Sequence, residues 1–98
     1  MTVRVLKTAR ADLAAGYWFY EQQETGLGDY FLRRIYEDLE LLGQIAGIHR
    51  QTVSGFHKMI ARRFPYAIFY RINGDTVEVL AILDGRRSPD WIRQQLKR

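Results

Sequence analysis

Apolar residues recur at two different spacings near the start of the chain, and each spacing predicts one type of element. Val3 and Val5 alternate with polar neighbours, which predicts a short strand over residues 2–7. From Ala9 to Gln23 the sequence is rich in Ala, Leu, Glu and Gln, which favours a helix. Thr8 directly precedes this segment and is suited to cap its first turn.

A second helix is predicted after the glycine-containing segment 25–29, and it should run to about Ala46. Because few residues separate the two helices, they should form an antiparallel hairpin. The apolar positions of the second helix recur every three to four residues and give it one buried face: Leu27, Phe31, Ile35, Leu39, Leu42 and Ile45.

Three further segments, 56–64, 66–72 and 76–83, are rich in Ile, Val, Phe and Tyr and are predicted to be strands. A tight turn should join the last two. If Gly74 and Asp75 form a two-residue loop, Arg71 faces Glu78 and makes a favourable cross-strand pair. A loop one residue earlier would leave Glu78 opposite an aromatic residue. We prefer the first register, with Gly74 at the first central position of a type II′ turn.

The last predicted strand is apolar on both faces, so both need cover. Alternation places Leu80 and Ile82 on one face. The helical hairpin can cover one face, whereas the other needs either a partner chain or the C-terminal segment. That segment is predicted to be a helix with Ser88 as N-cap, Pro89 in its first turn and Trp91 facing inward. The opposite face of the strand carries Val77, Val79, Ala81 and Leu83.

The expected order is therefore β-α-α-β-β-β-α, in an α+β fold with a helical hairpin packed on a small antiparallel sheet. At 98 residues, the chain fits one domain, residues 1–98. It has no cysteine and no apolar run of membrane-spanning length, so we expect a cytoplasmic protein without membrane attachment. The net charge is +4, but residues 1–48 carry five basic and seven acidic groups, whereas residues 49–98 carry ten and four.

Few residues suit catalysis or metal binding. His49 and His57 are the only histidines, and no carboxylate pair lies near them at ligand spacing, so neither a metal nor a cofactor is expected. What remains is a cationic set in the basic half, which either grips an anionic partner or is a solvated rim. Its members are Lys58, Arg62, Arg63, Arg71, Arg86, Arg87, Arg93, Lys97 and Arg98.

Four consecutive aromatic residues, Tyr17 to Tyr20, lie in the first predicted helix. They cover more than half of the helix circumference, so one buried face cannot accommodate them all. Tyr17 and Tyr20 fit the core. Trp18 or Phe19 should then be partly exposed, either packed under a loop or in contact with a partner.

The order of these segments resembles the RelE/ParE superfamily, the toxins of bacterial type II toxin–antitoxin modules. The resemblance covers nearly the whole chain. It implies a cytoplasmic toxin that a cognate antitoxin neutralises. One branch cleaves mRNA on the ribosome, and the ParE branch poisons DNA gyrase. The segments that carry the resemblance are Ala9-x-Ala11-Asp12-Leu13, Arg62 to Arg71, Val77 to Leu83 and Gly85-Arg86-Arg87.

Residue by residue, the nuclease set is incomplete. Lys58 and Arg87 match a lysine and an arginine of the RelE branch, but Ile60 and Ala67 replace two further basic residues. The C-terminal tyrosine of that branch is missing, and Trp91 stands nearby. RNA cleavage needs groups that activate the 2′-hydroxyl and stabilise the phosphorane, so efficient nuclease chemistry is not expected.

The ParE branch is therefore favoured, with DNA gyrase as target. The alternatives are a ribosome-dependent mRNA endonuclease and a degenerate toxin that only binds antitoxin. The expected nuclease residues are Lys58, Arg62 and Arg87. The expected target-binding residues are Arg62, Arg63, Arg86 and Arg87. The expected antitoxin-binding residues are Trp18, Phe19, Leu80, Ile82 and Trp91.

Overall fold

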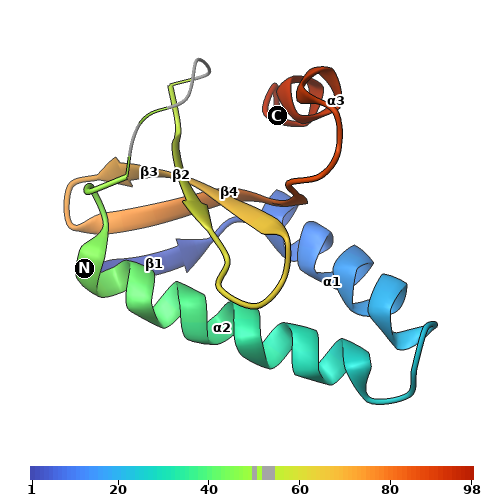
Figure 1. Cartoon of the computed structure of the whole chain (residues 1–98). Coiled ribbons are helices and arrows are strands. Elements are labelled where there is room, and N and C mark those ends of the chain that lie inside the picture. The colour runs from blue at the N-terminus through green and yellow to red at the C-terminus, as the bar shows by residue number, and fades with distance from the viewer. Residues whose placement is uncertain (50, 52–54) are drawn as a thin grey trace.

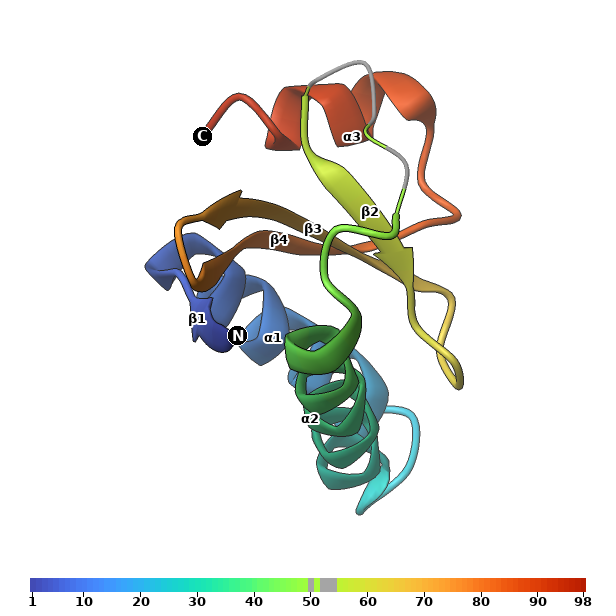
Figure 2. The ribbon, with the colours of Figure 1, turned by 90° about the vertical axis from the view of Figure 1, so that its left-hand side faces the viewer.

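The computed structural model describes residues 1–49, 51 and 55–98, and it confirms the predicted order of elements (Figure 1). A four-stranded sheet forms the middle of the molecule. The helices α1 and α2 pack on one face, and α3 lies over the other (Figure 2). The elements are β1 (Thr2–Val5), α1 (Lys7–Glu21), α2 (Leu27–Ile45), β2 (His57–Ile60), β3 (Tyr66–Asn73), β4 (Thr76–Asp84) and α3 (Pro89–Gln95).

The sheet has the order β1-β4-β3-β2, and it is mixed rather than purely antiparallel. The pairs β2–β3 and β3–β4 are antiparallel as expected, but β1 runs parallel to β4. The parallel direction follows from the long connection between the two strands. After β1 the chain passes through the helical hairpin, β2 and β3 before β4 pairs with β1. As a result β1 and β2 are the two edge strands of the sheet.

The turn between β3 and β4 has the preferred register. Arg71 pairs with Glu78 across the strands, with 2.7 Å between Nε and Oε1. Gly74 has a φ of 62°, whereas Asp75 does not have a positive φ, which fits the type II′ turn. Glu78 is 6% exposed, and Arg4 of β1 approaches it from the other side at 3.5 Å.

A β-bulge in β4 changes which residues face the helical hairpin. Phe69 pairs with Ala81 and Tyr70 with Val79, so Leu80 is the extra residue. Strict alternation was therefore the wrong expectation for β4: Val77, Val79 and Ile82 face the hairpin, whereas Ala81 and Leu83 face α3.

Side chains from α1 and from the C-terminus satisfy the backbone groups at the bulge. Asp12 accepts a hydrogen bond from the Ile82 amide at 3.0 Å, and its carboxylate also pairs with Arg98 at 2.6 and 2.8 Å. Thr8 donates to the carbonyl of Leu80 at 2.9 Å. Thr8 is thus not the predicted N-cap, because α1 begins at Lys7 and the hydroxyl is used by β4 instead.

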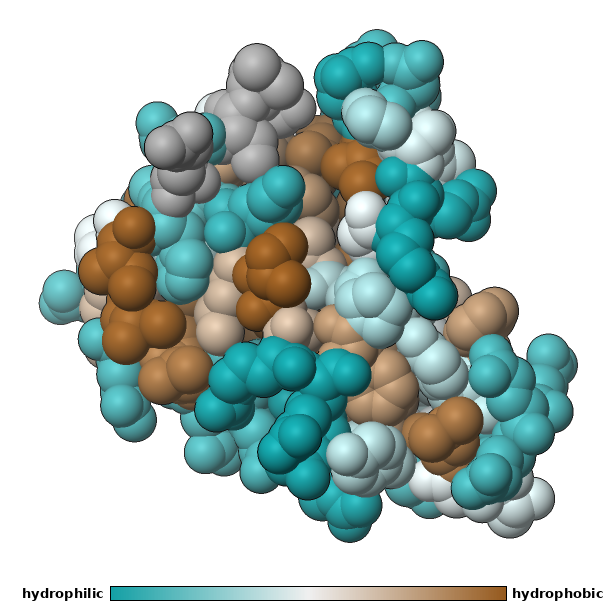
Figure 3. Space-filling view, in the orientation of Figure 1, coloured by the Kyte–Doolittle hydropathy of each residue, from teal (hydrophilic) through white to brown (hydrophobic). Residues whose placement is uncertain are grey.

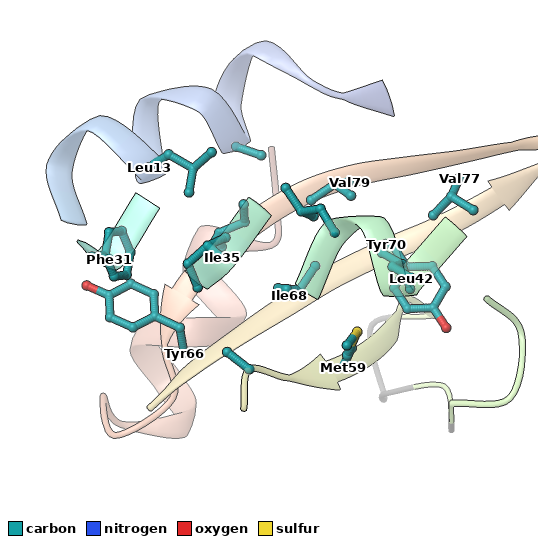
Figure 4. Close-up of a cluster of buried hydrophobic side chains, with 14 of the residues drawn as sticks. Leu13, Phe31, Ile35, Leu42, Met59, Tyr66, Ile68, Tyr70, Val77 and Val79 are labelled. Carbon is teal, nitrogen blue, oxygen red and sulfur yellow. The ribbon is translucent and has the colours of Figure 1, made fainter. Parts of the chain in front are cut away.

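The main core lies between the helical hairpin and the sheet (Figure 4). Phe31, Ile35 and Leu42 of α2 are fully buried there, as the helical spacing predicted. The strand predicted over 56–64 is shorter than expected: β2 ends at Ile60, and the Ala61 amide then donates to the carbonyl of Tyr66 at 2.8 Å where the chain turns toward Pro65. Phe64 leaves the strand and packs instead against aromatic rings of the hairpin.

A smaller apolar cluster lies on the opposite face, under α3. It contains Phe69 and Leu83 from the sheet and Leu96 from the end of α3. Of the two predicted covers for this face, the C-terminal helix is therefore the one observed within the chain. The cover is partial, because α3 has only seven residues and none of them is buried.

Candidate functional site

The start of α3 fixes the position of Arg87 and Trp91. The Ser88 hydroxyl accepts a hydrogen bond from the Trp91 amide at 3.1 Å, and Pro89 occupies the first turn, as predicted. The guanidinium of Arg87 lies 4.0 Å from the centroid of the Trp91 ring. This cation–π contact orients Arg87 without using its N–H donors. Those donors therefore remain available to bind another group.

An open groove lies between the sheet and α3, and we call it the β2–α3 groove. It has a volume of about 300 Å³. Figure 3 shows apolar surface in the hollow between the sheet and α3, bordered by hydrophilic side chains. Lys58 and Arg87, expected together from the sequence, both line it. The other lining residues are Ile60, Ala67, Phe69, Gly85, Pro89, Ile92, Arg93 and Leu96.

Two of these lining residues determine what chemistry the groove can support. Ile60 is 59% exposed at the rim, and Ala67, which is buried, lies in its wall. Neither side chain can move a proton or bind a phosphate. The described lining residues include the cations Lys58, Arg87 and Arg93. They include no carboxylate, histidine or tyrosine that could serve in general acid–base catalysis.

A second groove, the α1–α3 groove, lies on the other side of Arg87 and has a volume of about 270 Å³. It brings together Phe19, Ile82 and Trp91, three of the residues expected to bind a partner. Phe19 is half exposed, whereas Ile82 is 1% exposed and contributes only to the floor. Burial raises the pKa of the Tyr66 hydroxyl in this groove to about 12. The remaining lining residues are Asp12, Ala15, Gly16, Leu83, Asp84, Arg87 and Gln95.

Arg86 has a structural partner, which the sequence did not indicate. Its guanidinium donates to both oxygens of Asp84 at 3.0 and 2.8 Å, and its amide donates to the same carboxylate at 2.9 Å. The hydrogen bond from Arg86 lowers the pKa of Asp84. The side chain of Arg86 is nevertheless 62% exposed, and it borders a small hollow beside Ile60.

Arg62 and Arg63 lie in a different polar pocket, of about 200 Å³, so the four expected target-binding arginines do not form one cluster. Arg62 is bound to Asp38 of α2, with 2.6 Å between Nε and Oδ1. Asp38 is 1% exposed, and it also accepts from the Arg62 amide at 3.3 Å. Arg62 therefore holds a buried carboxylate, whereas Arg63 is exposed to solvent.

The two other residues expected to contact a partner lie apart from the grooves at Arg87. Trp18 is 59% exposed, which confirms the prediction from the aromatic run. It lines a shallow groove of about 390 Å³ on the hairpin with Leu32, Tyr36 and Arg10. Leu80 is the bulge residue and is 5% exposed, so it offers little surface.

Two groups of polar residues were missed in the sequence. Asp38 lies between Ile35 and Leu42 on the apolar stripe of α2, so the helical spacing alone could have indicated its burial. The second group is built on Tyr70, whose hydroxyl lies near His49 and the amide of Gly47. No spacing signal points to this group, because its members come from three different segments.

The part of the chain that the structure describes offers neither a metal-binding cluster nor a membrane-spanning helix. No group of three or more His, Cys, Asp or Glu side chains is arranged to hold a metal ion there. None of the helices in that part is long and apolar enough to span a bilayer.

The fold and the grooves define a small α+β protein whose sheet carries an apolar, cation-bordered surface beside a C-terminal helix. The family described as ParE toxin of type II toxin–antitoxin system, parDE, matches residues 3–89. This match covers most of the chain, and the chain therefore belongs to the ParE toxin family.

One solved structure shows the same fold over most of both chains. It comes from the chromosomal ParDE toxin–antitoxin system of P. aeruginosa. The two chains are 27% identical, and the TM-score is 0.72. The match covers 86% of this chain and 95% of the other. No curated protein sequence matches this chain.

Proposed function

We propose that this ParE family member inhibits growth by binding and poisoning DNA gyrase, and that a cognate antitoxin neutralises it. The observation that carries the proposal is the composition of the β2–α3 groove. Ile60 and Ala67 make it apolar, while Lys58 and Arg87 place two positive charges at its rim. Such a surface suits the docking of a protein segment that is apolar and acidic.

The same composition argues against the alternative of mRNA cleavage. Lys58 and Arg87 can bind phosphate, and this is the observation that favours the nuclease alternative. Cleavage also needs a group that removes the proton of the 2′-hydroxyl and one that protonates the leaving oxygen. The C-terminal tyrosine of the RelE branch is missing, and Trp91, which stands near its expected position, is stacked against Arg87 and has an indole that does neither.

We place antitoxin binding on the exposed aromatic residues. Trp18 and Phe19 are adjacent in α1 but open into different grooves, one on the hairpin and one beside α3. A single segment that covers both must cross α1. The similar ParDE structure comes from a toxin–antitoxin system, which supports a partner of this kind for this chain.

The test is a DNA supercoiling assay with purified protein. We expect micromolar wild-type protein to inhibit gyrase, and the double variant Lys58→Gln/Arg87→Gln to lose at least tenfold in potency. Lys7→Gln/Lys97→Gln is the matched control, because it removes the same charge from exposed positions outside the groove. Full gyrase activity with wild-type protein refutes the proposal. Discrete cuts in translated mRNA, mapped by primer extension, would support the nuclease instead.

A further inference from the structure

The hydroxyl of Tyr70 joins three segments on one side of the core. The amide of Gly47, just after α2, donates to Tyr70 Oη at 3.2 Å, and Nδ1 of His49 lies 2.6 Å from the same oxygen. The ring of His57 stacks on the Tyr70 ring, with centroids 5.0 Å apart. His57 Nδ1 lies 2.7 Å from the carbonyl oxygen of His49. Tyr70 itself is fully buried.

These contacts determine where the protons lie. A carbonyl only accepts, so His57 carries a hydrogen on Nδ1 and donates it to His49. Tyr70 Oη already accepts from Gly47, and its own proton finds an acceptor in Nδ1 of His49. His49 is then neutral, with its hydrogen on Nε2. Protonation of His49 at Nδ1 reverses this bond and leaves the buried Tyr70 proton without its acceptor.

We propose that Tyr70, His49 and His57 are positioning residues that hold β2, and with it Lys58, in place at the β2–α3 groove, and that protonation of His49 releases this hold. His57 is the first residue of β2 and Lys58 is the second. The importance of this hold for activity rests on the proposed function. The hold itself does not, because it concerns the order of β2 alone.

The surroundings of His49 set the direction of the pH effect. Burial lowers its pKa below the usual 6.5, and the imidazole of His57 lowers it further. β3 faces it with the Tyr70 phenol, β2 with His57, and the end of α2 with the neutral amide of Gly47. No carboxylate in the described residues adds to this balance. The hold is therefore complete above pH 6.5 and is lost as the pH falls through the lowered value.

The test is amide hydrogen exchange, expressed as protection factors so that the pH dependence of the intrinsic rate is removed. At pH 7.5 we expect β2 to be protected in the wild type, and at a pH low enough to protonate His49, found from the NMR shifts of its ring, we expect the protection to fall several-fold. The amides of β1, the other edge strand, serve as the internal reference and should change little.

Two variants separate the hold from general acid destabilisation. Tyr70→Phe keeps the buried ring but removes the hydroxyl, so β2 should exchange quickly at both pH values. His49→Asn offers an acceptor that does not titrate, so β2 should remain protected at both. Equal losses in β1 and β2, an unchanged wild type at the pH where His49 is protonated, or the wild-type pH response in His49→Asn would each overturn the proposal. None of these measurements involves gyrase, so they stand whatever the supercoiling assay shows.

Discussion

The pair formed by Asp38 and Arg62 offers a sharp test, because its two members differ strongly in exposure. Asp38 is 1% exposed in α2, whereas the side chain of Arg62 is 56% exposed. Arg62→Ala removes the guanidinium and leaves a buried carboxylate with one weak bond, from the backbone amide at 3.3 Å. Asp38→Asn leaves a neutral amide in the interior and an arginine that solvent can reach. The two changes should therefore have unequal costs.

The magnitudes follow from the cost of an unpaired buried charge. Removing one partner of a buried pair costs roughly 3 kcal/mol, and we assign this value to Arg62→Ala. Asp38→Asn keeps an acceptor for the Arg62 amide, so its cost should be that of one charged hydrogen bond, about 1.5 kcal/mol. In the double variant no charge is left unpaired. Its free energy of unfolding should therefore exceed that of Arg62→Ala alone, although it carries one more substitution.

Urea unfolding of the three variants and the wild type, followed by far-UV circular dichroism, measures these differences. Arg63→Ala is the matched control, because Arg63 is exposed beside Arg62 and should change stability by less than about 0.5 kcal/mol. The reasoning fails if Arg62→Ala is as stable as Arg63→Ala. It also fails if the double variant is less stable than Arg62→Ala. A stable Arg62→Ala protein that had lost only target binding would restore Arg62 to the target-binding surface.

Three further predictions concern single residues. Ser88→Ala removes the cap of α3 and should cost about 1 kcal/mol in urea unfolding, whereas Ser88→Asp should retain most of it. In Gly16→Ala, the new Cβ would lie 2.7 Å from the buried Phe31 ring, so we expect a loss of about 1–3 kcal/mol. Gly85→Ala, with its nearest neighbour at 3.4 Å, should be close to neutral. Because burial raises the pKa of Tyr66 to about 12, stability should decline as the pH rises from 10 to 12, and Tyr66→Phe should lessen that decline.

Much of the fold could be predicted because local patterns agreed with one another. The stripe of α2, the turn at Gly74 and the cap at Ser88 are each encoded by neighbouring residues, and each was found where it was expected. The parallel pairing of β1 was not predictable in this way. It depends on where the hairpin returns the chain, and no local signal in residues 2–5 distinguishes the two directions.

The bulge at Leu80 has the same kind of origin. Its backbone groups are satisfied by Thr8, Asp12 and Arg98, which lie far from it in the sequence. Alternation along β4 therefore predicted the wrong face for three residues after the bulge, Ala81, Ile82 and Leu83. The same limit applies to the candidate site. Lys58 and Arg87 could be placed together through the family resemblance, but the stacking of Arg87 on Trp91 could not be predicted without the position of α3.

Ion pairs within the chain reduce the positive charge that the basic C-terminal half presents to a partner. Arg62, Arg71, Arg86, Arg93 and Arg98 each contact a carboxylate of the chain itself. Their charges are largely compensated locally, so the excess of basic residues overstates the field that a distant partner meets. Lys58 and Arg87 make no such contact within the described residues, and both border the β2–α3 groove. Arg63 and Lys97 are exposed outside this groove, so within it Lys58 and Arg87 supply the short-range attraction for acidic groups that enter beside apolar ones. It follows that salt should weaken target binding only modestly, whereas loss of Arg87 should weaken it at every salt concentration.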